Sequence, residues 1–125
     1  MDKVINAIRE ISLNHPVIQR TILFGSRARG DNTEKSDYDI AIIAPGVELI
    51  EKNCISDEID LIDTFHEIDL VFLDNLYSQQ PLCENIKKDG KVIMDKFQAK
   101  LHNYKNALLR LHESIKDYRE NPNLT

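Results

Sequence analysis

Residues 25–43 read GSRARGDNTEKSDYDIAII, and this stretch together with the run before it defines the fold. The run before it, residues 17–24, is rich in β-branched and apolar side chains and predicts a strand. A Gly-Ser pair then interrupts that pattern. Residues 37–44, DYDIAIIA, predict a second strand. We therefore expect two strands joined by a polar loop that carries glycine, arginine and aspartate.

The rest of the chain alternates helical and strand patterns. We expect an amphipathic helix over residues 2–13, a short helix over 56–62, a third strand over 67–73, a helix over 79–89 with Gly90 in the capping position, and a short fourth strand over 91–94. The second and third strands are apolar on both faces over most of their length, which indicates a sheet covered by helices on at least one side. Strands that alternate with helices indicate an α+β or α/β fold.

The composition is that of an ordinary soluble domain, with 42% hydrophobic and 30% charged residues in a chain of 125. The net charge of −5 disfavours long nucleic acid as a partner, because binding a polyanion relies on a basic surface. A single nucleotide needs only a local positive pocket. The chain lacks a secretory signal and an apolar run of membrane-spanning length, and Cys54 and Cys83 lack metal-ligand or redox spacing. We expect a cytoplasmic protein with reduced thiols and no membrane partner.

Two carboxylates begin the second strand. Asp37 and Asp39 are two residues apart, so their side chains point to the same face of a strand. Carboxylates side by side repel each other unless a cation neutralises them. Mg²⁺ is the natural cation, because it takes oxygen ligands from one or two carboxylates together with substrate phosphates. On its own the pair is more typical of solvated acids at the edge of a sheet.

The loop ahead of these acids has the side chains of a phosphate site. Gly25 permits close approach of backbone amides to a phosphate, and the Ser26 hydroxyl can donate to a phosphate oxygen. Arg27 and Arg29 bring two permanent cations into the same loop. By itself a Gly-Ser turn is more often a plain loop, and only together with the acids that follow it does it indicate a phosphate site.

A third acid lies within an apolar strand pattern. Asp69 stands between Ile68 and Leu70, and a carboxylate in that setting is costly to bury without a cation or hydrogen bonds. A surface-facing acid on an edge strand is the alternative. If the third strand lies beside the second, Asp69 can face Asp37 and Asp39. Three carboxylates could then hold two metals about 3.5–4 Å apart for in-line phosphoryl displacement, with Asp69 accepting the proton of the attacking hydroxyl.

Gly25-Ser26, ten further residues and then Asp37-x-Asp39 resemble the signature of the DNA polymerase β nucleotidyltransferase superfamily. The GSRARG form is typical of its minimal nucleotidyltransferase (MNT) branch. The resemblance covers about residues 4–95 and implies an α+β nucleotidyltransferase fold, in which a mixed sheet of about four strands carries helices mainly on one face.

The resemblance also implies roles for the candidate residues. Gly25 and Ser26 would bind the triphosphate, whereas Asp37, Asp39 and Asp69 would hold two Mg²⁺ ions and carry the catalysis. Arg27 and Arg29 are expected to contact the phosphates of the nucleotide. ATP is the implied substrate, transfer of AMP to a hydroxyl with release of pyrophosphate is the implied reaction, and the sequence does not indicate the acceptor.

The C-terminal segment carries an apolar stripe with a 4-3 spacing, formed by Phe97, Leu101, Tyr104, Leu108, Leu111, Ile115 and Tyr118. We divide the chain into a nucleotidyltransferase domain, residues 1–95, and an amphipathic helix, residues 96–120. The helix could pack on its own sheet, dock a partner, mediate homo-oligomerisation or begin a helical substrate-binding domain of a longer fused protein.

The family resemblance implies a separate all-helical partner of the substrate-binding or HEPN type, in some cases as a toxin–antitoxin pair in which the nucleotidyltransferase adds AMP to its partner. A non-catalytic module that sequesters such a partner through residues 97–118 is the alternative hypothesis.

Overall fold

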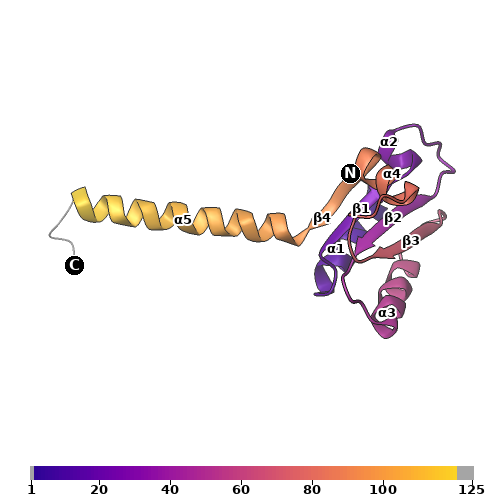
Figure 1. Cartoon of the computed structure of the whole chain (residues 1–125), viewed down its shortest axis with the longest axis horizontal. Coiled ribbons are helices and arrows are strands. Elements are labelled where there is room, and N and C mark those ends of the chain that lie inside the picture. The colour runs from indigo at the N-terminus through magenta and orange to yellow at the C-terminus, as the bar shows by residue number, and fades with distance from the viewer. Residues whose placement is uncertain (1, 121–125) are drawn as a thin grey trace. The chain divides into compact units, whose positions relative to one another are not determined.

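The computed structural model describes residues 2–120, apart from the side chains of residue 99 and residues 116–120. The chain divides between Asp95 and Lys96 into two compact units. The first holds a sheet and four helices, and the second holds one long helix, α5 (Figure 1).

The sheet has four strands in the order β3-β2-β1-β4. Their bounds are Arg20–Phe24 for β1, Tyr38–Ile43 for β2, Ile68–Leu73 for β3 and Lys91–Asp95 for β4. β1 pairs antiparallel with β2 and with β4, whereas β2 pairs parallel with β3. The sheet is therefore mixed, as predicted, with β2 and β1 in its interior.

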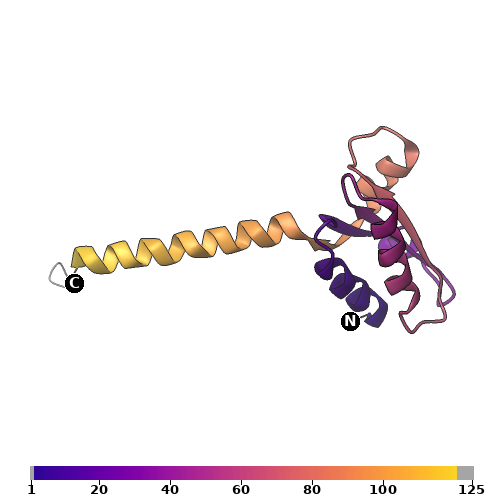
Figure 2. The same ribbon diagram turned by 90° about the horizontal axis from the view of Figure 1, so that it is seen from below.

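Two helices cover one face of this sheet. α1 (Lys3–Asn14) and α3 (Leu49–Asp60) lie side by side (Figure 2), and their buried side chains pack on alternate residues of the strands. Asp2 caps α1 by accepting the backbone N–H groups of Val4 and Ile5, at 2.8 and 3.3 Å. This layer holds the larger of the two apolar clusters, which includes Ile8, Ile40, Ile42, Ile55 and Ile59.

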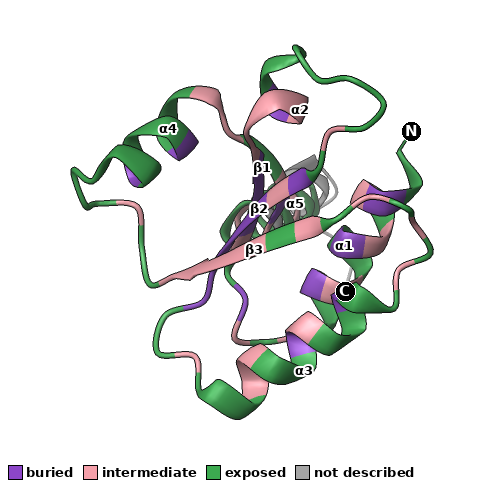
Figure 3. Cartoon of the chain, turned by 90° about the vertical axis from the view of Figure 1, so that its right-hand side faces the viewer, coloured by how far each residue is buried: buried purple, intermediate pink, exposed green. Residues whose placement is uncertain are grey.

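Within the described residues of the first unit, the short helix α4 (Pro81–Asp89) packs on the other face. Ile86 of α4 packs there with Ile22, Ala41 and Ile43. Figure 3 shows burial concentrated in the central strands, with the outer surfaces of the helices exposed. Because α4 covers only part of this face, the end of β2 that carries Asp39 is left partly accessible.

Two predicted element starts were wrong by three residues or more. α3 begins at Leu49, seven residues before the predicted start at residue 56. Leu49 and Ile50 are 72% and 73% exposed, so the first turn lacks the buried apolar spacing that identifies a helix from sequence. β1 begins at Arg20, later than predicted, because the preceding residues form a turn in which the Ile18 N–H donates to the His15 carbonyl at 3.1 Å.

Gly90 lies in the C-cap position of α4, as predicted, although not in the left-handed conformation usual there. A Cβ at this position would lie 2.3 Å from the Ile86 carbonyl oxygen and 2.7 Å from the Ile22 side chain. Close packing of α4 against β1 therefore requires glycine at this position.

The second unit is the helix α5, Lys96–Glu120. Five of its predicted stripe residues are exposed, namely Phe97, Tyr104, Leu108, Leu111 and Ile115, and Leu101 is half-buried. The side chain of Tyr118 lies outside the described residues. Among the described residues, no helix combines the length and apolar character needed to cross a membrane.

Candidate active site

The backbone at Gly25 lies directly against the side chain of Asp39 on β2. Gly25 has φ 74° and ψ −159°, a region open almost only to glycine, and it caps the short helix α2 (Ser26–Arg29). A Cβ on Gly25 would lie 2.2 Å from Oδ2 of Asp39. The backbone of the candidate phosphate turn is thus seated against the candidate metal ligand, and only glycine allows that approach.

Asp37, Asp39 and Asp69 lie at the same end of the sheet. In the strand register Asp39 of β2 lies opposite Phe24 of β1 on one side and opposite Asp69 of β3 on the other. Asp37 immediately precedes β2, and its Oδ1 accepts the backbone N–H of Glu67 at 3.3 Å. The condition set from the sequence, that the third strand lie beside the second, is met.

The acids interact electrostatically. Burial raises the pKa of Asp39 above its ordinary value, and the charges of Asp69 and Asp37 raise it further, while Arg29 opposes the shift. Because the charged form of Asp39 is disfavoured, a cation bound beside it would stabilise that carboxylate.

This donor set fits a divalent cation of the Mg²⁺ type, since it offers hard carboxylate oxygens. Among the described side chains, no three of His, Cys, Asp or Glu converge as a preformed metal cage. Mg²⁺ does not require one, because it commonly binds through one or two carboxylates plus substrate phosphates.

The two candidate arginines take different positions. Arg29 is exposed and pairs with Asp31 at 3.1 Å, and this pairing raises its pKa, with smaller contributions from Asp89 and Asp39. Arg27 instead donates from Nε to the Ser36 carbonyl at 3.0 Å. Of the two, Arg29 is the one with an electrostatic interaction with Asp39.

Arg27 belongs to a contact network with Tyr38, on the face of β2 opposite to Asp39. Its guanidinium lies 4.1 Å from the centroid of the Tyr38 ring, a cation–π contact. The Tyr38 hydroxyl donates to Oδ2 of Asp2 at 2.7 Å, which ties this strand to the cap of α1. Tyr38 is buried and belongs to the larger apolar cluster. The sequence signal that could have indicated Asp2 is its place before a helix, where aspartate is a favoured cap.

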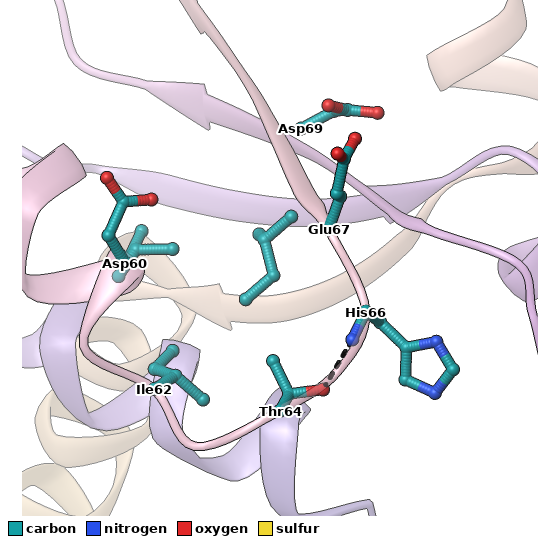
Figure 4. A pocket seen from close by; sticks show the side chains of 8 residues that line it. Asp60, Ile62, Thr64, His66, Glu67 and Asp69 are labelled. Carbon is teal, nitrogen blue, oxygen red and sulfur yellow. Dashed lines mark hydrogen bonds between the residues drawn. The ribbon is translucent and has the colours of Figure 1, made fainter.

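A pocket of about 350 Å³ opens beside Asp69. Residues from the end of α3, the following loop and the start of β3 line it, among them Asp60, Ile62, His66 and Glu67. In Figure 4, Asp60 stands on one side of the pocket, Glu67 and Asp69 stand on the other, and the His66 ring points away. Sequence reasoning did not find this pocket, because its walls come from elements whose packing only the fold determines.

A mixed sheet with paired acids on its second and third strands and a Gly-Ser turn against them defines a nucleotidyltransferase. The family model described as "Polymerase beta, Nucleotidyltransferase" matches residues 6–99. The chain belongs to this family, and the family predicted from residues 25–43 is confirmed. No curated protein matches the chain.

The chain is also similar to solved minimal nucleotidyltransferase structures. A toxin–antitoxin crystal structure with AMP-PNP shows 25% identity and a TM-score of 0.57, covering 90% of this chain and 95% of that one. A Y104A mutant of a toxin–antitoxin pair, MntA-HpeT, shows 27% identity and a TM-score of 0.52, covering 92% and 93%. A tri-AMPylated Shewanella oneidensis HEPN toxin in complex with its MNT antitoxin shares the fold at 22% identity and a TM-score of 0.53, covering 93% and 96%.

Proposed function

We propose that this nucleotidyltransferase transfers AMP from ATP to a hydroxyl on an all-helical HEPN-type partner, as the antitoxin-like member of a toxin–antitoxin pair. The observation that carries the chemistry is the register pairing of Asp39 with Asp69, with the Gly25 turn seated against Asp39. The choice of partner and nucleotide is supported by the similar toxin–antitoxin structures, one with AMP-PNP and one with an AMPylated HEPN toxin.

Each candidate residue then has a defined task. The Gly25-Ser26 turn binds the triphosphate, and the guanidinium of Arg29 supplies positive charge to its phosphates. Asp37, Asp39 and Asp69 would hold two Mg²⁺ ions, which supply charge neutralisation to the attacking and leaving oxygens when bound. Asp69 accepts the hydroxyl proton, the acceptor oxygen bonds to the α-phosphorus, and the bond from that phosphorus to the pyrophosphate oxygen breaks.

Substitution of the acids tests the reaction. Asp37→Asn and Asp39→Asn retain side-chain size while removing the charge, so both should fold and both should lose Mg²⁺-dependent pyrophosphate release. Release at the wild-type rate by both variants would contradict the mechanism.

The exposed stripe on α5 favours a second role in binding. Leucine, tyrosine and isoleucine side chains along one long helix are suited to packing against another helix. Leu101→Asp and Leu108→Asp should weaken association with the helical partner. The two roles are not exclusive. A complex that forms at undiminished strength without nucleotide and after loss of all three acids would favour pure binding.

A further inference from the structure

The ring of Tyr38 is contacted by side chains from two other segments of the site, on the face of β2 opposite to Asp39. Tyr38 is only 4% exposed. The guanidinium of Arg27, on α2, lies over the ring at 4.1 Å from its centroid. The ring of His66, which points away from the pocket in Figure 4, lies 5.8 Å from the Tyr38 ring, centroid to centroid, in a T-shaped contact at 68°. One buried ring therefore joins α2, β2 and the loop before β3.

Asp37 depends on its neighbours for its position, because it lies outside the paired part of β2. The strand and its pairing with β3 begin one residue later, at Tyr38. Asp37 is exposed, and its Oδ1 accepts the backbone N–H of Glu67 at 3.3 Å. The Tyr38 N–H donates in turn to the Glu67 carbonyl at 3.0 Å. The carboxylate of Asp37 is therefore held through the residues on either side of it and through Glu67.

Arg27 contacts both neighbours of Asp37. Its Nε donates to the carbonyl of Ser36, and its guanidinium lies over the ring of Tyr38. A planar group with donors in a fixed geometry can make these two contacts together. Arg27 also directly follows Ser26 on α2, so the same side chain links the candidate phosphate turn to the candidate metal ligand.

We infer that Arg27 and Tyr38 are positioning residues of the transfer reaction, which hold the carboxylate of Asp37 in place as a ligand of Mg²⁺. This inference rests on the proposed function. It gives Arg27 a task behind the acids, in place of the phosphate contact expected from the sequence. Arg29, two residues further along the chain, is then the arginine that serves the triphosphate.

Two substitutions of Arg27 separate positioning from phosphate binding. Lysine retains the positive charge but lacks the planar group that reaches both Ser36 and Tyr38. Arg27→Lys and Arg27→Ala should therefore both lower kcat for pyrophosphate release by about 10–100-fold, the usual effect of removing a group that orients a metal ligand, and both should retain KM for ATP. Arg9→Ala, which removes an exposed arginine of α1, should change neither constant.

Substitutions of Tyr38 test the other half of the contact. Tyr38→Leu removes the ring and should lower kcat as Arg27→Ala does, whereas Tyr38→Phe keeps the ring and should retain kcat. The double variant Arg27→Ala/Tyr38→Leu should lose little more than either single variant, because both break the same contact. Tyr77→Leu is the matched control, since Tyr77 is 89% exposed and should tolerate the change.

Binding of a non-hydrolysable ATP analogue gives a readout that does not depend on turnover. Its dissociation constant is measured with Mg²⁺ and with EDTA, at a temperature at which circular dichroism shows each variant to be folded. Arg27→Lys should weaken binding in the presence of Mg²⁺ and leave binding without metal unchanged. A phosphate contact by Arg27 would behave differently, because its loss in Arg27→Ala would weaken binding with and without metal.

The inference would be overturned by wild-type kcat in Arg27→Lys together with weaker metal-free binding in Arg27→Ala, which would make Arg27 a phosphate ligand. Wild-type kcat and wild-type binding with Mg²⁺ in Tyr38→Leu would also overturn it. A wild-type chain that releases no pyrophosphate with the helical partner as acceptor would contradict the proposed function, and the binding measurements would still decide the task of Arg27.

Discussion

Gly25→Ala is the substitution for which the structure makes the sharpest prediction. It acts in two ways, since alanine is strained at φ 74° and ψ −159° and its Cβ would lie 2.2 Å from Oδ2 of Asp39. Backbone strain in this region costs about 1–3 kcal/mol. For a domain of this size each kcal/mol lowers the melting temperature by about 4–8 °C, so a fall of roughly 4–24 °C is expected.

The contact with Asp39 adds a catalytic effect. Either the carboxylate or the turn must move, and a displacement of about 1 Å at a reacting centre can lower the rate by about 100-fold. Pyrophosphate release and binding of a non-hydrolysable ATP analogue with Mg²⁺ measure this loss. Gly46→Ala is the matched control, because Gly46 also has a positive φ of 68° and its Cβ would have no atom within 4 Å. It should lose stability without losing transfer.

A double-mutant cycle separates the two effects. In an Asp39→Ala background Oδ2 and Cγ are gone and the nearest remaining atom of residue 39 is its Cβ at 3.3 Å, so Gly25→Ala should there cost little beyond its backbone strain in thermal unfolding. Strictly additive losses of stability, or a Gly25→Ala variant that transfers at the wild-type rate, would refute the inference that the turn is seated against the carboxylate.

Three further predictions follow from the site. Asp39→Asn should raise the free energy of unfolding at pH 7, because burial and the charges of Asp69 and Asp37 raise the pKa of Asp39 and the folded state therefore disfavours its charged form. The gain should be complete above that raised pKa, shrink as the pH falls through it and vanish below the ordinary carboxyl pKa, and a destabilised variant in denaturant titrations at pH 7 would contradict it. Arg27→Ala should destabilise the domain by about 1–3 kcal/mol through loss of its hydrogen bond and cation–π contact, whereas Arg29→Ala should mainly raise KM for ATP, and the opposite pattern in melting and kinetics would reverse their roles. Tyr38→Phe should cost about 1 kcal/mol in thermal unfolding through loss of its buried hydroxyl bond, with kcat retained if the ring still supports Arg27.

Much of the fold was predictable because its signals are local. Strands rich in isoleucine and an aspartate pair at strand spacing report directly on backbone geometry. The start of α3 was not predictable, since its first apolar residues are exposed and carry no periodic signal. The structure describes the predicted helix beyond residue 95, but the division into domains and the role of that helix stay predictions.

The candidate site was predictable to the extent that spacing encodes it. Asp37 and Asp39 share a face by their separation alone, whereas the position of Asp69 beside them depends on parallel pairing of β3 with β2. The contacts of Arg27 were not foreseeable, because two arginines two residues apart on a one-turn helix point in different directions. The catalytic and metal-binding roles of all these residues stay proposals.

Nucleotidyl transfer to the helical partner is tested most directly by measuring the mass of that partner. The chain is incubated with ATP, Mg²⁺ and the product of the neighbouring gene, in parallel with its Asp39→Asn variant. A partner that gains one or more AMP units with the wild-type chain and none with the variant is the predicted result. An unmodified partner in a stable complex with the wild-type chain, under the same conditions, would contradict nucleotidyl transfer to that partner.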